Sequence, residues 1–250
     1  MNTKYIGLIV SLLGPFALTA CNSSDGSGAL GQDQQVHNST QIPGDGKSDT
    51  PITGNGSSVV GDSCAGKNDA THPCLALKYV VYKNSDGSPV MTQDEVISTV
   101  REVNSIWATC NISFQIDQYL AANPVDYALT FNTANDSELD QIRRAFQTDS
   151  TLLVATTGTW DRSGTLGNTG ANAWTNMPGD GIYGVVLESP VGSFGNIVAH
   201  ELGHYLNLDH VSDQSNVMNP IVYDTSTALN SGQCSTAMAA INYYWQSMRR

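Results

Sequence analysis

The stretch that decides the fold is VAHELGHYLNLDHVSDQSNVMNP, residues 198–220, which holds three of the five histidines of the chain. His200 and His204 are four residues apart, so a helix places both imidazoles on one face, close enough together to bind one metal ion. Glu201 then lies beside the metal rather than on it, where a general base for an activated water is needed. This spacing predicts a metal-dependent hydrolytic site on a helix.

Two histidines leave such a site incomplete, because catalytic zinc takes three protein ligands and keeps a fourth position open. His210 supplies the third ligand if the chain turns sharply after the helix. Asn207 predicts that turn, since Asn tolerates the left-handed conformation that ends many helices. The alternative is a buried helix whose histidines serve packing or hold a structural metal. A structural zinc would need a fourth ligand, and no cysteine lies near in the sequence.

The segment HELGHYLNLDH resembles the elongated zinc signature of the metzincin peptidases, with Asn207 where the family has Gly. Met218, eight residues after the last histidine, resembles the methionine turn of that family, and the short gap with its Met-x-Pro ending resembles the matrixin branch. The resemblance covers roughly residues 76–250. It implies a zinc endopeptidase with one catalytic zinc and a protein or peptide substrate. The implied site residues are His200, His204 and His210 as ligands, Glu201 as general base, and Met218 packed beneath the metal.

The segment ANAWTNMPGDGIYG is similar to the matrixin edge strand and the loop after it. The resemblance implies that this strand holds the substrate backbone, as an exposed edge would also do on physical grounds. The residues involved are Ala171, Asn172, Ala173 and Trp174. Pro220 and Tyr223 are implied as the wall of the pocket beyond the cut bond. The segment from Pro220 to Tyr223 is one residue longer than in the family, so the depth of the pocket is not predicted.

Strands alternate with helices along the chain, which predicts a mixed α/β (α+β) domain without internal repeats. The resemblance implies a twisted mixed sheet of about five strands, with an active-site helix, a backing helix and a C-terminal helix. The expected strands are 75–84, 111–120, 125–131 and 150–160, then an edge strand and a last strand within 170–189, separated by a loop at 177–181. The expected helices are 92–110, 136–146, 193–206 and 234–250.

The chain has 250 residues with 40% hydrophobic and 14% charged residues, enough for one buried domain plus a less ordered part. Eleven Lys and Arg stand against 23 Asp and Glu, a net charge of -12 that argues against nucleic acid as a partner.

The two remaining histidines, His37 and His72, precede the expected domain, so no histidines are left for a second, structural zinc. Calcium held by aspartates and carbonyls stays open as an alternative. We expect a monomer.

The first twenty residues read as an export signal, because Lys4 precedes an apolar run, Ile6 to Leu18, that is too short to span a bilayer. Residues 18–21, Leu-Thr-Ala-Cys, resemble a bacterial lipobox, which implies a lipid on Cys21. Asn22 resembles the outer-membrane sorting signal of such lipoproteins. We therefore expect a lipid-anchored protein of the bacterial cell envelope, or one released from it; an ordinary secreted protein is the alternative.

Residues 21–75 are expected to be a flexible tether or short prosegment, because residues 22–62 contain no aromatic residue and too little apolar surface to fold. His37 is a solvated bystander in this reading, and the domain is expected at 76–250. Four cysteines remain in an oxidising setting and allow three pairings. We favour Cys64 with Cys74 and Cys110 with Cys234, against a free thiol. Cys64 also faintly resembles the cysteine switch of matrixin prosegments.

Two other functions fit the same residues. One is a non-catalytic surface binding protein that keeps the scaffold and uses zinc to stabilise it. The other is a zinc amidase that acts on cell-wall peptides.

Overall fold

The computed structural model describes residues 59–64 and 68–250. The predicted export signal, the lipidation site Cys21, Asn22 and His37 lie outside these described residues. Within the described part, no helix combines the length and the apolar character needed to cross a membrane.

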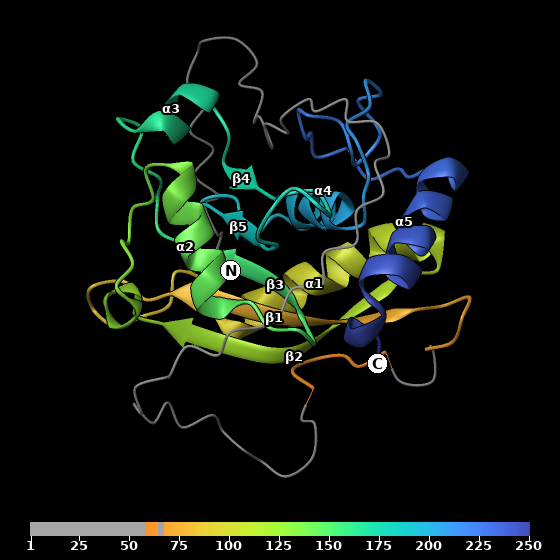
Figure 1. Ribbon diagram of the computed structural model, residues 1–250, viewed down its shortest axis with the longest axis horizontal. Helices are drawn as coiled ribbons and strands as arrows, with labels where there is room; N and C mark the ends of the chain where they lie inside the picture. The colour runs from red at the N-terminus through yellow and green to blue at the C-terminus, as the bar shows by residue number, and fades with distance from the viewer. Residues whose placement is uncertain (1–58, 65–67) are drawn as a thin grey trace, which may run out of the picture.

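A five-stranded mixed sheet forms the centre of the molecule, in the order β2-β1-β3-β5-β4 (Figure 1). Three neighbouring pairs run parallel, and only β4 runs antiparallel to its neighbour β5. The sheet therefore has two edges, β2 on one side and β4 on the other. The strands are β1 Cys74–Tyr82, β2 Ser113–Ala122, β3 Leu152–Thr156, β4 Ala173–Trp174 and β5 Val185–Leu187.

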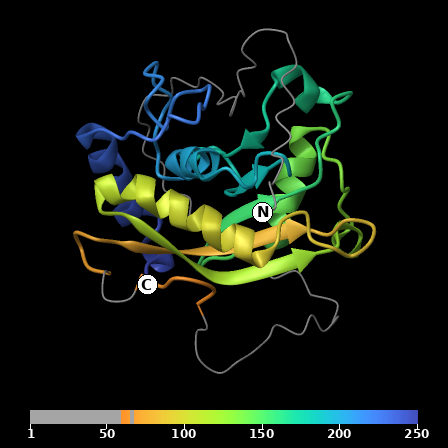
Figure 2. The same ribbon diagram turned by 180° about the vertical axis from the view of Figure 1, so that it is seen from behind.

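One face of the sheet is covered by α1 (Gln93–Trp107), α4 (Gly195–Tyr205) and α5 (Ser231–Tyr244). Alternate residues of β1, such as Leu77 and Tyr79, point into this core with the apolar stripe of α1. α1 lies beside α4 in both views (Figures 1 and 2), and the indole of Trp107 donates to the Ala199 carbonyl of α4 at 3.2 Å. α1 is therefore the backing helix that the resemblance implies.

The opposite face carries α2 (Asp136–Phe146) and the segment that contains the short helix α3 (Thr165–Thr169). Val80 and Tyr82, which alternate with the residues of the first face, belong to this second core. β1 is thus buried on both faces, as expected for a central strand of a largely parallel sheet.

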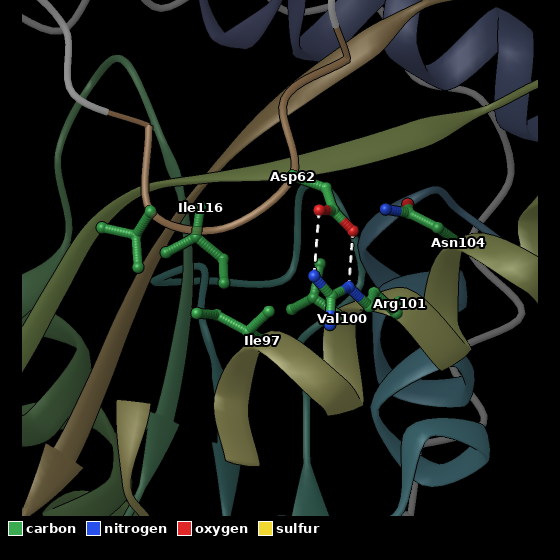
Figure 3. A pocket seen from close by; sticks show the side chains of 7 residues that line it. Asp62, Ile97, Val100, Arg101, Asn104 and Ile116 are labelled. Carbon is green, nitrogen blue, oxygen red and sulfur yellow. Dashed lines mark hydrogen bonds and ion pairs between the residues drawn. The ribbon is translucent and has the colours of Figure 1, made fainter. Parts of the chain in front are cut away.

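The described chain begins before residue 76, where the sequence placed the start of the domain. Residues 59–64, which we call the N-terminal strap, lie on β2 and α1 (Figure 3). The amide of Val60 donates to the Ile116 carbonyl of β2 at 2.8 Å, which forms an antiparallel bridge. Arg101 of α1 donates to both carboxylate oxygens of Asp62.

Both favoured disulfides are present. Cys64–Cys74 joins the N-terminal strap to β1, and Cys110–Cys234 joins the 3-10 helix η1 (Ala108–Cys110) after α1 to the first turn of α5. Cys64 is therefore a disulfide partner rather than a switch thiol, and the free-thiol alternative is wrong for all four cysteines.

The strand expected at 125–131 is wrong. Pro124–Tyr127 forms the 3-10 helix η2, and Ala128 follows with a left-handed φ of 55°. Pro124 explains the difference, because proline fixes φ near the helical value and has no amide to donate to a strand ladder. The exposed Val125, 74% accessible, shows that the apolar letters of this segment do not mark a buried strand.

The C-terminal helix differs at both ends from the expected 234–250. Asn230 caps α5: its side-chain oxygen accepts from the Gln233 backbone amide, and the Gln233 side-chain oxygen accepts from the Asn230 backbone amide, so the helix begins at Ser231. It ends at Tyr244, after which η3 (Gln246–Met248) leads Arg249 into an antiparallel bridge with Leu75 of β1. The last residues thus return to the sheet. The segment before β4 contains the short helix α3, and the expected edge strand is only two residues long.

Candidate metal centre

Helix α4 and the bend after it bring the three histidines of the motif together. His200 and His204 lie one turn apart on α4 and are fully buried, and His210 approaches from beyond the helix end. One nitrogen of each ring lies within 4.8 Å of the others. The Nε2 atom of His204 is 3.1 Å from that of His200 and 3.2 Å from that of His210.

Backbone carbonyls determine which ring nitrogen is available. Nδ1 of His200 contacts the Val217 carbonyl at 2.7 Å, and Nδ1 of His204 contacts the Leu208 carbonyl at 2.8 Å. Because a carbonyl oxygen can only accept, Nδ1 carries the proton in both rings and Nε2 presents its lone pair. The lone pairs of neighbouring rings therefore converge.

Burial of the His200 and His204 side chains keeps both rings neutral. Desolvation, followed by the charge of His204, lowers the pKa of His200 well below its usual range. Desolvation, followed by the charge of His210, lowers the pKa of His204 to about 3. Neutral imidazole is the form that binds a metal ion.

This donor set fits zinc. A tetrahedral zinc with three nitrogen ligands at about 2.0 to 2.1 Å separates those nitrogens by roughly 3.3 Å. The separations of His204 Nε2 from the other two Nε2 atoms, 3.1 and 3.2 Å, match that spacing, and all three ligand atoms lie within 4.8 Å of one another. The Nε2 lone pairs of His200 and His204 face each other at 3.1 Å and cannot hydrogen-bond to one another, which a cation between the rings explains. A structural role without metal, as packing histidines, would leave these lone pairs facing each other in a buried place.

The bend at Asn207 has the predicted conformation. Asn207 has a φ of 64°, in the left-handed region, and its amide donates to the His204 carbonyl at 2.9 Å. The amide of Leu208 then donates to the Gly203 carbonyl at 3.0 Å, which closes the helix end. The Leu208 carbonyl in turn accepts from His204. The turn thus both redirects the chain towards His210 and orients a ring of the cluster.

Met218 is completely buried and lies against the active-site helix. A Cβ at position 203 would collide with the Met218 Sδ atom, so this contact explains why glycine occupies that position. The amide of Met218 is held by the side chain of Asn216, whose own amide group exchanges two hydrogen bonds, at 2.8 and 3.0 Å, with Gln233 of α5. The methionine turn is therefore fixed to two helices.

Glu201 is fully buried on the same helix, and its Oε2 atom accepts a hydrogen bond from the Thr175 hydroxyl at 2.7 Å. Thr175 directly follows β4 and is only 3% accessible. The carboxylate is thus tied to the edge of the sheet. Sequence reasoning missed Thr175, because nothing in the local pattern around residue 175 indicates a partner 26 positions away.

The predicted substrate-binding residues of β4 contribute in different ways. Ala171 and Ala173 have fully buried side chains, one in each core, so only their backbones remain candidates for substrate contact. The side-chain amide of Asn172 donates to the Glu188 carboxylate at 2.6 Å, and the backbone carbonyl of Trp174 accepts from Arg143 of α2 at 3.0 Å. These two contacts hold the edge in place.

Pro220 and Tyr223 are both half-buried, in the segment after the methionine turn. The carbonyl of Tyr223 accepts from Asn196 in the first turn of α4 at 2.8 Å, and its amide donates to the Ser226 hydroxyl at 2.9 Å. The end of this segment is thus held to α4, and a turn from Tyr223 to Ser226 follows it. Asn196 could have been noticed only as a polar residue on an otherwise apolar helix.

His72 is exposed and contacts Asp69 and Thr71, away from the three-histidine cluster. The small hollow in Figure 3 is also elsewhere: it lies between the N-terminal strap, α1 and β2, with Asp62 and Arg101 facing each other over Ile97 and Ile116. Neither feature adds to the metal centre.

Comparison with known proteins gives one family match: the matrixin family model matches residues 72–235. Metalloproteinase-II from Bacteroides fragilis is a similar solved structure, with 16% identity and a TM-score of 0.46 over 69% of this chain and 55% of that chain. A chaperone–substrate complex matches with 11% identity and a TM-score of 0.44 over 72% of this chain and 36% of that one. This chain therefore spans little more than half of the first structure and about a third of the second. No curated protein matches it.

Proposed function

The chain belongs to the matrixin family, and on that premise we propose that it is a zinc-dependent endopeptidase. The observation that carries the proposal is the convergence of three imidazole Nε2 atoms on the helix that also bears the buried Glu201 carboxylate. This combination places two of the metal ligands and a proton acceptor on one helix, and the third ligand follows the bend at the end of that helix. The substrate would be a protein or peptide.

In this proposal His200, His204 and His210 hold the zinc through Nε2. A zinc ion bound there would supply a Lewis acid that polarises a carbonyl and lowers the pKa of water towards neutrality. Glu201 takes one proton from the attacking water and passes it to the nitrogen of the leaving amine. The water oxygen becomes bonded to the carbonyl carbon, and the peptide C–N bond breaks.

The substrate backbone would add to the β4 edge as a further strand, because β4 lies at the end of the sheet and, within residues 59–64 and 68–250, has only β5 as a strand neighbour. Pro220 and Tyr223 would form the wall of the pocket beyond the cut bond. Their segment is held to α4 by Asn196, so its position is coupled to the helix that carries the ligands.

Glu201→Ala tests the base. We expect zinc content to stay at that of the wild type and the peptide cleavage rate to fall by at least about two orders of magnitude, the usual scale for a general base. Glu201→Gln, which keeps the shape of the side chain, should lose activity to a similar extent. Full peptidase activity in either variant would rule out this mechanism.

His210→Ala tests the third ligand by metal analysis. We expect loss of bound zinc, whereas the matched control His72→Ala should retain it, because His72 is exposed and outside the cluster. Unchanged zinc in His210→Ala would mean that the third ligand is another residue.

Mass-spectrometric profiling of a peptide library and of peptidoglycan fragments distinguishes the competing functions. We expect cleavage within peptides and none of the cell-wall fragments. Zinc binding without any cleavage would favour a binding protein, and cleavage of cell-wall peptides alone would favour an amidase.

We further propose that the mature chain is attached to the bacterial cell envelope, at the outer membrane, by a lipid on Cys21, as the lipobox-like sequence before it suggests. Cys21→Ala should then move the protein from the membrane fraction to the soluble fraction. An unchanged distribution, with no lipid found by mass spectrometry of the wild type, would favour ordinary secretion.

A further inference from the structure

The hydrogen bond between Thr175 and Glu201 joins two parts of the molecule that are distant in sequence. Thr175 Oγ1 donates to Glu201 Oε2 at 2.7 Å, and both side chains are almost completely removed from solvent. A hydrogen bond from a hydroxyl to a buried carboxylate is charge-assisted and directional. It therefore restricts how the carboxylate can rotate.

Thr175 is itself held from both sides. The carbonyl of Trp174, just before it, accepts from the guanidinium of Arg143, and the side-chain amide of Asn176, just after it, donates to the Ile182 carbonyl at 2.9 Å. The hydroxyl therefore starts from a backbone that cannot easily shift. Its reach to Glu201 is determined by the fold and not by chance contact of a mobile side chain.

The anchor of Arg143 extends this arrangement to α2. Arg143 is 1% accessible, donates from Nε to the Gly184 carbonyl at 2.9 Å, and pairs with Asp140 of its own helix at 2.9 Å. A connected series of hydrogen bonds thus runs from α2 through the end of β4 to α4. It ends on the one carboxylate that the proposed chemistry requires.

We propose that Thr175 is a positioning residue for Glu201: its hydroxyl orients the carboxylate of the general base, and the Arg143-anchored β4 edge holds the hydroxyl in place. This inference rests on the proposed endopeptidase function and adds a residue to it. The β4 edge, which would pair with the substrate backbone, thereby also sets the orientation of the Glu201 carboxylate. Substrate binding and proton transfer would therefore depend on the same strand.

The test compares Thr175→Val with Thr175→Ser in the full mature chain. Valine has the shape of threonine without the hydroxyl, and serine keeps the hydroxyl. We expect Thr175→Val to lower kcat by about ten- to a hundredfold, the range expected for a misplaced catalytic group. KM should change by less than about twofold, because the side chain is buried behind the edge. Thr175→Ser should recover most of the lost rate.

Thr133→Val is the matched control, because Thr133 is also fully buried and its hydroxyl has no hydrogen-bond partner among the described residues. It should leave kcat unchanged. Zinc content and melting temperature are measured for every variant, so that loss of metal or of the fold is detected separately from loss of rate.

A double-mutant cycle shows whether Thr175 acts through Glu201. In the Glu201→Gln background, Thr175→Val should change the residual rate by less than about twofold, because the group that it orients is gone. A further loss as large as in the wild type, equal losses in the serine and valine variants, or an unaffected valine variant would each overturn the positioning role. The decreases in melting temperature should likewise be less than additive, and this readout needs no activity.

The two proposals fail in different ways. An active wild type with a fully active Thr175→Val would overturn only the positioning role. A wild type that binds zinc and cleaves no peptide would overturn the proposed function itself, and the positioning role with it.

Discussion

At the β2 edge of the sheet, the N-terminal strap is attached by an antiparallel bridge, a disulfide and an ion pair whose side chains are about 60% exposed. At the β4 edge, a strand of only two residues is held by a buried guanidinium and leads into a hydroxyl that bonds a buried carboxylate. The first edge is covered by the described chain itself. Among the described residues, the second has only β5 as a strand neighbour.

The difference indicates which edge serves binding. An unpaired strand edge invites another strand, and proteins usually cover such edges. Here the N-terminal strap covers the β2 edge through contacts that are partly exposed to solvent. The β4 edge is left open for strand pairing, and buried polar groups on the protein side hold it in place. We infer a separation of roles: both edges contribute to stability, whereas the proposed binding of substrate belongs to the β4 edge alone. The variants below test that separation, in order of decreasing expected effect.

Arg143→Met should have the largest effect on stability. It keeps an apolar stem but removes the donor to the Gly184 and Trp174 carbonyls, each worth about 1 to 3 kcal/mol when left unpaired in a buried place. We expect the free energy of unfolding in urea to fall by about 3 kcal/mol and KM for a peptide to rise as β4 loosens.

The matched control is Arg144→Met, since Arg144 is the next residue of the same helix and is exposed. It should leave both quantities unchanged. Equal effects of the two substitutions would show that the β4 edge has no special support, and the contrast between the edges would disappear.

Replacing both Cys64 and Cys74 by Ser tests the other edge. The closed loop spans ten positions, for which the chain-entropy account gives a loss of about 2.5 kcal/mol in the free energy of unfolding. The kcat and KM of the folded variant should not change, because the strap lies at the edge opposite β4. A loss of kcat in the folded variant would show that the two edges are coupled.

The same division runs through what could be predicted from the sequence. The three histidines, Glu201 and the turn at Asn207 follow from spacing along one helix and from the conformational preference of one residue. The structure brings the histidines together and gives Asn207 its left-handed φ of 64°. These are local interactions, so a single stretch of sequence contains the information.

The support of the site could not be predicted in this way. The Thr175–Glu201 and Arg143–Trp174 hydrogen bonds join residues 26 and 31 positions apart, and the bridge from Val60 to Ile116 depends on how the strap folds back over β2. The sequence around Thr175, Arg143 and Val60 contains no pattern that indicates which residue each of them contacts. Such contacts follow from the three-dimensional arrangement of the elements.

Two other differences between the predicted and the observed elements have a signal in the local sequence. Pro124 argues against a strand at 125–131, since it cannot donate to a ladder. Asn230 with Gln233 forms a capping box that marks the start of α5, three residues before the predicted start at Cys234. Both signals are local and can be read from the sequence.

Gly203→Ala tests how tightly the methionine turn is packed. The added Cβ collides with the Met218 Sδ atom, and overpacking of this kind costs about 1 to 2 kcal/mol when a flexible side chain can partly yield. We expect this loss in stability and weaker zinc binding by titration with a chelator. Gly232→Ala is the control, because the new Cβ on α5 meets only Asn230 Oδ1, at 3.2 Å. Unchanged zinc affinity in Gly203→Ala would mean that the methionine turn can shift without disturbing the metal ligands.

Asp62→Asn should have the smallest effect. Arg101 donates to Asp62 at 2.5 and 3.0 Å, but the two side chains are each 60% accessible, so water and salt screen the pair. Its hydrogen bond to Arg101 lowers the pKa of Asp62 below the usual value near 4. Any contribution is therefore present above about pH 4 and is lost as the pH falls and the carboxylate is protonated.

We expect the urea midpoint of Asp62→Asn to match that of the wild type at neutral pH, in low and in high salt, with kcat unchanged. The disulfide and the backbone bridge hold the strap without the ion pair. A destabilisation comparable to that of Arg143→Met would contradict the separation between the edges. It would mean that the exposed ion pair at the β2 edge stabilises the fold as much as the buried hydrogen bonds of Arg143 do at the β4 edge.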